Sequence, residues 1–344
     1  MTQGGFRIAV VTLAVVLPAI AARAQTVAAP PLIPDVNAVL SDARRLIDEG
    51  KPKEAISRLR SADANVAEVG QLLGVAYYHA DDHQKAIEQL SAVRDRLPEG
   101  SLARRETIQV LGLCYYLTGK FSEAIPLLED TRTWAADNLE LSHTLGLAYI
   151  QTRQPDKARA SLARTFRVPP DSAAAHVIAA QMMIRVEMEP QAEAELKRAL
   201  ENDPRTPRAH YLLGQMALFR GRLDDAVRLT ERELEINPSD AMAFYQLGDA
   251  HLRGSRFDDA AAALQRSLWL NPYYSGPYIL LGRVYMKKSD PATAEGMLRR
   301  AIEYDPNNRS AHYLLAQLLQ QTGRVEEAKR EFAIAERLQP PGPK

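Results

Sequence analysis

The chain has 344 residues, of which 25% are charged, 46% are hydrophobic and only 6% are aromatic. Lys and Arg together number 43, and so do Asp and Glu, so the chain lacks the basic excess with which nucleic-acid-binding proteins neutralise phosphates. This balance is typical of solvated helices, and it argues against nucleic acid as a partner.

Residues 1–24 form a predicted secretion signal. Arg7 supplies a positive charge, and residues 8–22 are an apolar run of the length of a signal h-region, short for a membrane span and interrupted by Pro18. The small residues Ala22 and Ala24 predict cleavage after Ala24, and therefore an exported protein, periplasmic or secreted. An uncleaved signal kept as an anchor is the alternative, and it is the one membrane attachment that the sequence suggests.

Residues 25–35 form a predicted linker, because the run QTVAAPPLIP is rich in proline and alanine and has no periodicity. The helical pattern starts after Asp35 and continues to about residue 340, and residues 341–344 form a short tail. Cys114 is the single cysteine, so no intramolecular disulfide can form. Its place on an apolar helix face predicts a buried structural thiol.

Small residues recur at intervals of 34 along most of the chain. The first series consists of Gly112, Gly146, Ala180, Gly214, Gly248, Gly282 and Ala316, and the second of Ala124, Ala158, Ala192, Ala226, Ala260, Ala294 and Ala328. A third series, Pro238, Pro272, Pro306 and Pro340, closes the later units. Two less regular units precede residue 97, so we expect nine units, with a longer loop or an extended helix around residues 97–101.

Each unit reads as a pair of helices. In the eighth unit Leu281 and Tyr285 lie on one apolar face, and Ala294 and Leu298 lie on another, with Asp290 as a candidate N-cap between them. Glycine or alanine recurs where two helices must approach closely, because a larger side chain would separate them. In the last unit Glu336 replaces an apolar residue of the earlier units, as expected for an uncovered terminal unit.

These residues resemble the tetratricopeptide repeat family. The pattern Leu281-Gly282-Arg283-Val284-Tyr285, followed by Ala294, Leu298 and Pro306, matches its motif, and the likeness covers about residues 36–340. The resemblance implies an all-α fold, a right-handed superhelical solenoid of about nine helix-turn-helix repeats. It also implies a concave groove, lined by the first helix of each pair, that binds a protein or peptide partner.

The resemblance assigns a set of positions to this groove. They are Tyr78, Tyr116, Gln181, Arg185, Tyr211, Gln215, Phe219, Tyr245, Arg253, Arg283, Lys287, Tyr313 and Gln317. Tyr and Arg often anchor protein interfaces, because they combine large contact areas with directional hydrogen bonds. Packing against neighbouring helices is the alternative role for several of the tyrosines. The lysine-asparagine clamp of chaperone-tail receptors has no counterpart, since its asparagine positions hold Gln, Asp and Arg.

Residues that suggest other chemistry have structural interpretations. His176, His210 and His312 share a register that also accepts Phe and Tyr, which predicts packing rather than a metal site. The pairs Asp224-Asp225, Asp258-Asp259 and Glu326-Glu327 start second helices, where carboxylates are expected as caps. No phosphate loop, CxxC, HExxH or GxSxG motif occurs. The sequence therefore predicts no cofactor, no metal and no catalytic site.

The predicted function is a non-catalytic interaction scaffold or adaptor. One alternative is a structural subunit of an envelope assembly, a secretion machine or a polysaccharide-export complex, bound through the convex face or the ends of the solenoid. An alternative of another class is an enzyme, a lyase or hydrolase, with an unrecognised site on the solenoid. The identity of the partner and the oligomeric state stay open.

Overall fold

A computed structural model describes residues 35–338. The predicted signal, most of the predicted linker and the predicted tail lie outside these residues. The described part is built from eighteen α-helices in nine antiparallel pairs, as the repeats predict. The first helices are α1 (Val36–Asp48), α3 (Ala67–His79), α5 (Leu102–Leu117), α7 (Leu139–Gln151), α9 (Ala173–Arg185), α11 (Ala209–Phe219), α13 (Ala241–Arg253), α15 (Ser275–Lys287) and α17 (Arg309–Gln321). The second helices are α2 (Pro52–Leu59), α4 (His83–Val93), α6 (Phe121–Trp134), α8 (Pro155–Thr165), α10 (Glu189–Asn202), α12 (Leu223–Ile236), α14 (Phe257–Leu270), α16 (Pro291–Tyr304) and α18 (Val325–Arg337).

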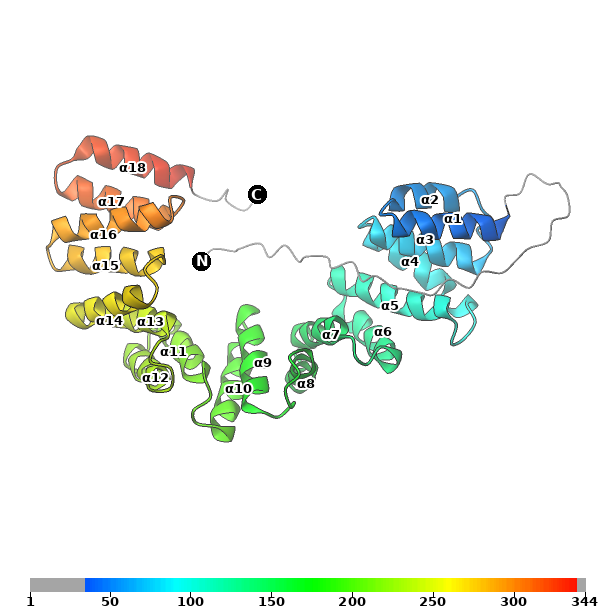
Figure 1. Ribbon diagram of the computed structural model, residues 1–344, viewed down its shortest axis with the longest axis horizontal. Coiled ribbons are helices and arrows are strands. Elements are labelled where there is room, and N and C mark those ends of the chain that lie inside the picture. Colours follow the sequence, from blue (N-terminus) through cyan, green and yellow to red (C-terminus); the bar gives the residue numbers. More distant parts are fainter. Residues whose placement is uncertain (1–34, 339–344) are drawn as a thin grey trace.

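The pairs stack side by side into an arch, with α1–α4 at one end and α15–α18 at the other (Figure 1). First helices such as α9, α11 and α13 lie on its inner side, and their partners α10, α12 and α14 lie outside (Figure 1). The all-α solenoid of nine units is therefore confirmed. In such an array each pair buries its apolar face against its neighbours, so a long surface forms without one closed core.

Close approach within a pair explains the glycine series. A Cβ atom on Gly146 would lie 2.7 Å from Leu162, and one on Gly282 would lie 2.6 Å from Leu298. Both leucines are completely buried, so neither can move aside without loss of packing. Glycine is thus required at these positions by the neighbouring helix and not by backbone conformation.

The turn inside every pair carries one residue with a positive φ. These residues are Gly50, Asp81, Gly119, Arg153, Glu187, Gly221, Ser255, Ser289 and Gly323. In the eighth unit Asp290 follows this residue and accepts a hydrogen bond from the Thr293 N–H at 3.1 Å, which confirms the predicted N-cap. Five of these nine residues are not glycine, so the sequence does not mark the left-handed position of their turns.

The connection before α5 is longer than the others, as predicted. A 3-10 turn, Arg94–Arg96, follows α4, Leu97 turns into the core, and Gly100 has a φ of +74°. Ser101 then caps α5 by accepting from the Arg104 N–H at 3.2 Å. The extra residues therefore form both a helical extension and a loop.

The acidic pairs lie in the first turns of α12, α14 and α18, but they do not act as side-chain caps. Instead they bridge neighbouring elements: Asp224 pairs with Arg256 of the next unit at 2.8 Å, and Asp258 pairs with Lys288. Glu327 pairs with Arg324 next to the start of its own helix. The predicted place of the acidic pairs at the start of second helices is therefore confirmed, but they form no side-chain cap, and Asp224, Asp258 and Glu327 form ion pairs instead.

The sixth pair, α11 and α12, has a polar layer in place of an apolar one. Thr230 occupies the register that holds a buried leucine in most other second helices, such as Leu196 and Leu264. Its hydroxyl accepts a hydrogen bond from the buried Gln246 amide at 2.7 Å, and that amide also donates to the Tyr211 carbonyl at 3.2 Å. This unit is thus held by hydrogen bonds where its neighbours rely on apolar packing.

Candidate functional site

The predicted groove residues lie on first helices from α3 to α17 and differ in exposure. Seven are exposed, namely Arg185, Gln215, Phe219, Arg253, Arg283, Lys287 and Tyr313. Tyr78, Tyr116, Gln181, Tyr245 and Gln317 are half-buried. Tyr211 is only 5% exposed, and the Arg208 guanidinium carbon lies 4.8 Å from its ring centroid. Tyr211 is therefore a packing residue, the alternative role that the sequence left open for the tyrosines.

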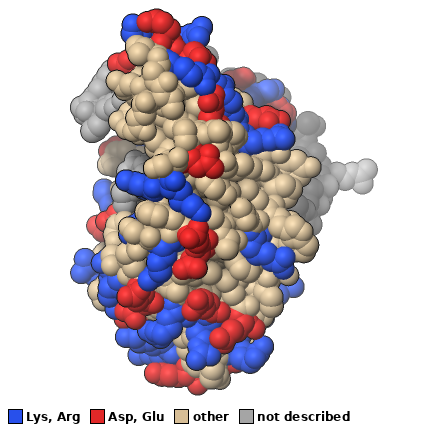
Figure 2. Space-filling view, turned by 90° about the vertical axis from the view of Figure 1, so that its left-hand side faces the viewer, with Lys and Arg blue, Asp and Glu red and all other residues tan. Residues whose placement is uncertain are grey.

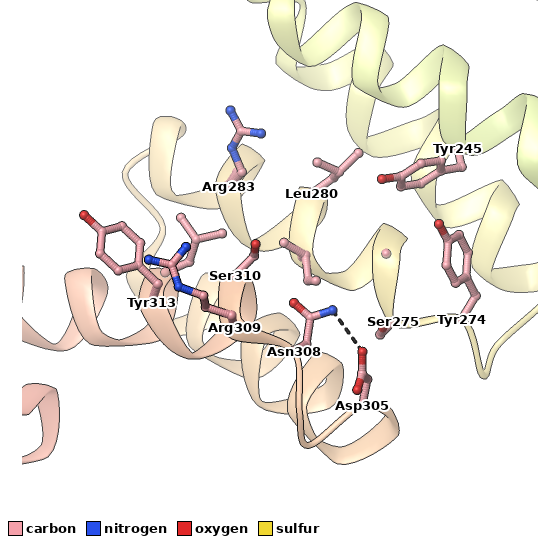
Figure 3. A pocket seen from close by; sticks show the side chains of 13 residues that line it. Tyr245, Tyr274, Ser275, Leu280, Arg283, Asp305, Asn308, Arg309, Ser310 and Tyr313 are labelled. Carbon is pink, nitrogen blue, oxygen red and sulfur yellow. Dashed lines mark hydrogen bonds between the residues drawn. The ribbon is translucent and has the colours of Figure 1, made fainter. Parts of the chain in front are cut away.

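Three of the predicted residues, Tyr245, Arg283 and Tyr313, line one hollow of about 700 Å³ (Figure 3). It lies between α13, α15 and α17, and we call it the C-terminal hollow. The other residues that line it are Tyr274, Ser275, Gly276, Ile279, Leu280, Asp305, Asn308, Arg309, Ser310 and Leu314. Its volume lies in the range of about 300–1,000 Å³ that is typical of ligand sites.

One end of the hollow is aromatic. The rings of Tyr245 and Tyr274 meet edge to face, with centroids 5.3 Å apart and an interplanar angle of 62°, and both stand at the same end in Figure 3. Burial raises the pKa of Tyr245 and of Tyr274. Both phenols therefore keep their protons near neutral pH, so each can donate a hydrogen bond.

The other end of the hollow is cationic. Figure 3 shows Arg309 and Tyr313 side by side at this end, and Arg283 of α15 stands apart from them on the same side of the hollow. Among residues 35–338, neither guanidinium forms an ion pair with a carboxylate. Asp305 lines the hollow as well, but its carboxylate accepts from the Asn308 side-chain amide at 3.0 Å and from the Asn307 N–H at 3.3 Å. The hollow thus offers two arginines and several hydrogen-bond donors to a ligand.

Sequence reasoning missed the residues that precede or begin the first helices. Tyr274 and Asn308 occupy the connections before α15 and α17, and Ser275 and Arg309 are the first residues of these helices. Tyr274 and Asn308 are one repeat length apart, and so are Ser275 and Arg309. A comparison of equivalent positions in successive connections would therefore have found them.

Two of the three histidines of the shared register have a carboxylate partner, whereas the buried Nδ1 of His210 has no hydrogen-bond partner among residues 35–338. His176 is buried with Nδ1 2.7 Å from Glu195, and His312 is buried with Nδ1 2.6 Å from Glu331. In both cases the carboxylate comes from the second helix of the same unit. Within the described range, no three His, Cys, Asp or Glu side chains are grouped so that they could hold a metal ion.

Cys114 is completely buried, as predicted, and burial raises the pKa of its thiol to about 12.

The face that carries the C-terminal helices shows basic and acidic side chains interspersed rather than gathered (Figure 2). This face therefore has no continuous basic surface of the kind that binds phosphates. Between residues 35 and 338, no helix has both the length and the apolar character needed to cross a bilayer.

Comparison with known proteins gives two matching family models, both described as tetratricopeptide repeat. One matches residues 115–182 and 285–341, and the other matches residues 190–241 and 219–275. Together they account for more than half of the chain.

Individual relatives match only parts of the chain or match it loosely. BBSome complex member BBS4 from Bos taurus is 31% identical over 145 residues, which are 41% of this chain and 27% of that protein. The chain thus matches about a quarter of the length of this curated relative. Among solved structures, MamA from Desulfovibrio magneticus RS-1 is 21% identical, with a TM-score of 0.45 over 48% of this chain and 94% of its own. YrrB, titled a TPR protein with an unusual peptide-binding site, is 20% identical, with a TM-score of 0.44 over 54% and 95%.

Proposed function

The chain belongs to the tetratricopeptide repeat family, and from this premise we propose that it is a non-catalytic scaffold that holds a protein or peptide partner in its groove. The observation that carries this proposal is the convergence of Tyr245, Arg283 and Tyr313 on one hollow. These residue types are enriched at the energetic centres of protein interfaces. The Tyr313 ring packs edge to face against Phe332, with centroids 5.5 Å apart, but 44% of the residue stays exposed and can contact a partner.

A second surface favours the alternative of a structural subunit that binds outside the groove. Trp269 at the end of α14 is 70% exposed, and Tyr273 in the following connection is 76% exposed. The Arg266 guanidinium carbon lies 4.1 Å from the Trp269 ring centroid, and Tyr273 meets Tyr304 edge to face at 5.7 Å. We call these four residues the aromatic edge. Large exposed aromatic side chains beside arginine are typical of interaction surfaces.

We also propose that the protein is exported. The basic Arg7, the apolar run of residues 8–22 and the small residues before Gln25 support this proposal. The mass of the protein purified from its own cells tests it: a mature chain that begins at Gln25 is expected, and a full-length chain would leave an uncleaved anchor as the better interpretation.

Site-specific photocrosslinking in the native cells separates the two binding surfaces. We expect a photoreactive phenylalanine analogue at position 313, in the C-terminal hollow, to capture a discrete partner protein. The same analogue at position 269, in the aromatic edge, serves as the matched control, because both native residues are exposed aromatics. Each variant is first checked for native helicity and thermal stability, so that a loss of capture cannot reflect misfolding.

The outcomes assign the function. Capture from position 313 but not from position 269 supports the groove scaffold. The reverse result would overturn it in favour of the subunit that binds through its edge. A protein that crosslinks from neither position, although both variants are folded and abundant, has no stable partner at these surfaces, and the interaction function would be wrong.

A further inference from the structure

The C-terminal hollow has a charge that selects among possible partners. Arg283 and Arg309 contribute two positive charges, and no carboxylate in residues 35–338 forms an ion pair with either. Asp305 contributes the one negative charge of the lining, and its oxygens are already occupied by Asn307 and Asn308. The hollow is therefore net positive and disfavours a basic ligand by like-charge repulsion.

The donors around the hollow complement this charge. The guanidinium groups have donors only, and the phenols of Tyr245 and Tyr274 stay protonated, as derived above. No side chain caps the start of α15, where Ser275 and Gly276 line the hollow. A group that accepts several hydrogen bonds and carries negative charge, such as a carboxylate, fits this arrangement best.

The rest of the lining fits a peptide. Ile279, Leu280 and Leu314 add apolar groups to the lining, and Leu280 lies between the aromatic end and Arg283 (Figure 3). An extended chain presents successive side chains in opposite directions, so one side chain can reach the arginines while a neighbour contacts the apolar surface. Lys287, one turn beyond Arg283 on α15, extends the positive charge along the groove.

We propose that the C-terminal hollow binds an acidic, extended segment of a partner protein, with an Asp or Glu carboxylate held between Arg283 and Arg309. An apolar side chain next to this carboxylate packs on Ile279 and Leu314, beside the ring of Tyr245. The inference rests on the proposed scaffold function, and it adds the chemical class of the segment and the residues that select it.

Selection of peptides from a random library tests this specificity directly. The probe is a library of random dodecapeptides, displayed with their C-termini blocked by fusion so that no terminal carboxylate is available. The baits are the unmodified protein, the Arg283→Gln, Arg309→Gln double variant, and the Arg164→Gln control. Arg164 is an exposed arginine on the second helix α8, outside the predicted groove residues, so its substitution changes the net charge without touching the site.

We expect the unmodified protein and the Arg164→Gln control to enrich the same acidic peptides with an apolar neighbour. The double variant is expected to lose them. For a selected peptide, fluorescence anisotropy is expected to show about ten-fold weaker binding for each single arginine variant, since a charged hydrogen bond is lost. Replacement of the acidic residue by Gln in the peptide is expected to weaken binding by a similar factor. Both arginines are exposed and unpaired, so the variants should keep their thermal stability.

Each of the other outcomes would contradict one part of the proposal: the acidic specificity, the place of the site or the scaffold function. Enrichment of neutral or basic peptides would overturn the acidic specificity and leave the scaffold function in place. If acidic peptides bind the double variant as tightly as the unmodified protein, their binding site lies outside this hollow and the proposal is wrong. If no peptide is enriched by any bait, and photocrosslinking from position 313 also captures nothing, the scaffold function itself fails.

Discussion

The turn within each helix pair requires a left-handed backbone, and five of the turns meet this requirement without glycine. A residue with a Cβ atom pays roughly 1–2 kcal/mol in this conformation, whereas glycine adopts it freely. Ser255 and Ser289, with φ of 59° each, are exposed, and neither side chain forms a hydrogen bond within residues 35–338. We therefore expect Ser255→Gly and Ser289→Gly each to raise the free energy of unfolding by about 0.5–1 kcal/mol, after the entropy that glycine gains in the unfolded chain is subtracted.

Urea unfolding monitored by circular dichroism measures this effect. The matched control is Ser91→Gly, because Ser91 is an exposed serine inside α4, where φ is negative. There the same substitution is expected to lower stability by about 0.5–1 kcal/mol. If Ser255→Gly and Ser289→Gly destabilise the protein as much as Ser91→Gly does, the left-handed turns are not strained.

At the scale of single elements, the polar layer between α11, α12 and α13 leads us to expect opposite changes in stability for two variants. Thr230→Val keeps the side-chain shape but removes the oxygen that accepts from the buried Gln246 amide. We therefore expect this variant to lower the free energy of unfolding by about 1 kcal/mol. Replacing both Thr230 and Gln246 by leucine restores the residue type found at these registers in other units, such as Leu264 and Leu280. We expect this double variant to raise the free energy of unfolding by about 1–3 kcal/mol, because it buries more apolar surface.

Chemical unfolding of both variants beside the unmodified protein checks this pair of predictions. Hydrogen exchange in α11 and α12 adds a local readout, since protection there should fall in the first variant and rise in the second. A double variant less stable than Thr230→Val would show that Gly214 and its surroundings have no room for two leucines. In that case the polar layer would be a consequence of steric limits.

The helices were predictable from sequence because their signals are local, whereas the site depends on contacts between units. The cap at Asp290 follows from a short stretch, and the glycine series and the long connection before Ser101 follow from the spacing of equivalent residues along the sequence. The burial of Tyr211 does not, because it depends on Arg208 and on the neighbouring unit.

The same difference explains which residues of the hollow were found. Tyr245, Arg283 and Tyr313 lie inside first helices, at positions that the family resemblance assigns to the groove. Arg309 and Tyr274 enter the hollow only because consecutive connections are brought together by the stacking of pairs. Their packing is tertiary, so no helical periodicity marks them.

At the scale of the whole molecule, packing between consecutive units is sparsest between α10 and α11, although one apolar cluster that includes Leu196 and Leu212 continues across this junction. The chain is left-handed at Arg208, with a φ of 70°, so α11 starts only at Ala209. The buried Glu233 carboxylate of α12 accepts from the Arg208 and Tyr211 N–H groups at 2.7 and 3.1 Å, and so satisfies N–H groups at the start of α11. A superhelix bends most easily where neighbouring units share the least surface.

One arginine bridges this junction and makes it sensitive to acid. Arg220, at the end of α11, contacts Glu193 at 2.7 Å and Glu189 at 3.0 Å, both on α10. Hydrogen bonds from Arg220 and Lys197 lower the pKa of Glu193 from 4.5 to about 2. Because the folded pKa is below the unfolded one, the stabilisation is complete above about pH 4.5 and is lost as the pH falls toward 2.

We therefore expect Arg220→Ala to lower the free energy of unfolding by about 1 kcal/mol near pH 6, because solvent screens a bridge that is partly exposed. Near pH 3.5 the difference between this variant and the unmodified protein should shrink, since protonation of Glu193 in the unfolded chain removes much of the bridge's contribution. Urea titrations at both pH values measure the two differences. Arg232→Ala is the control, because Arg232 pairs with Glu235 inside α12 at 2.9 Å and crosses no junction. An Arg220→Ala effect no larger than that of the control, or one unchanged at low pH, would mean that the bridge does not hold the two parts of the array together.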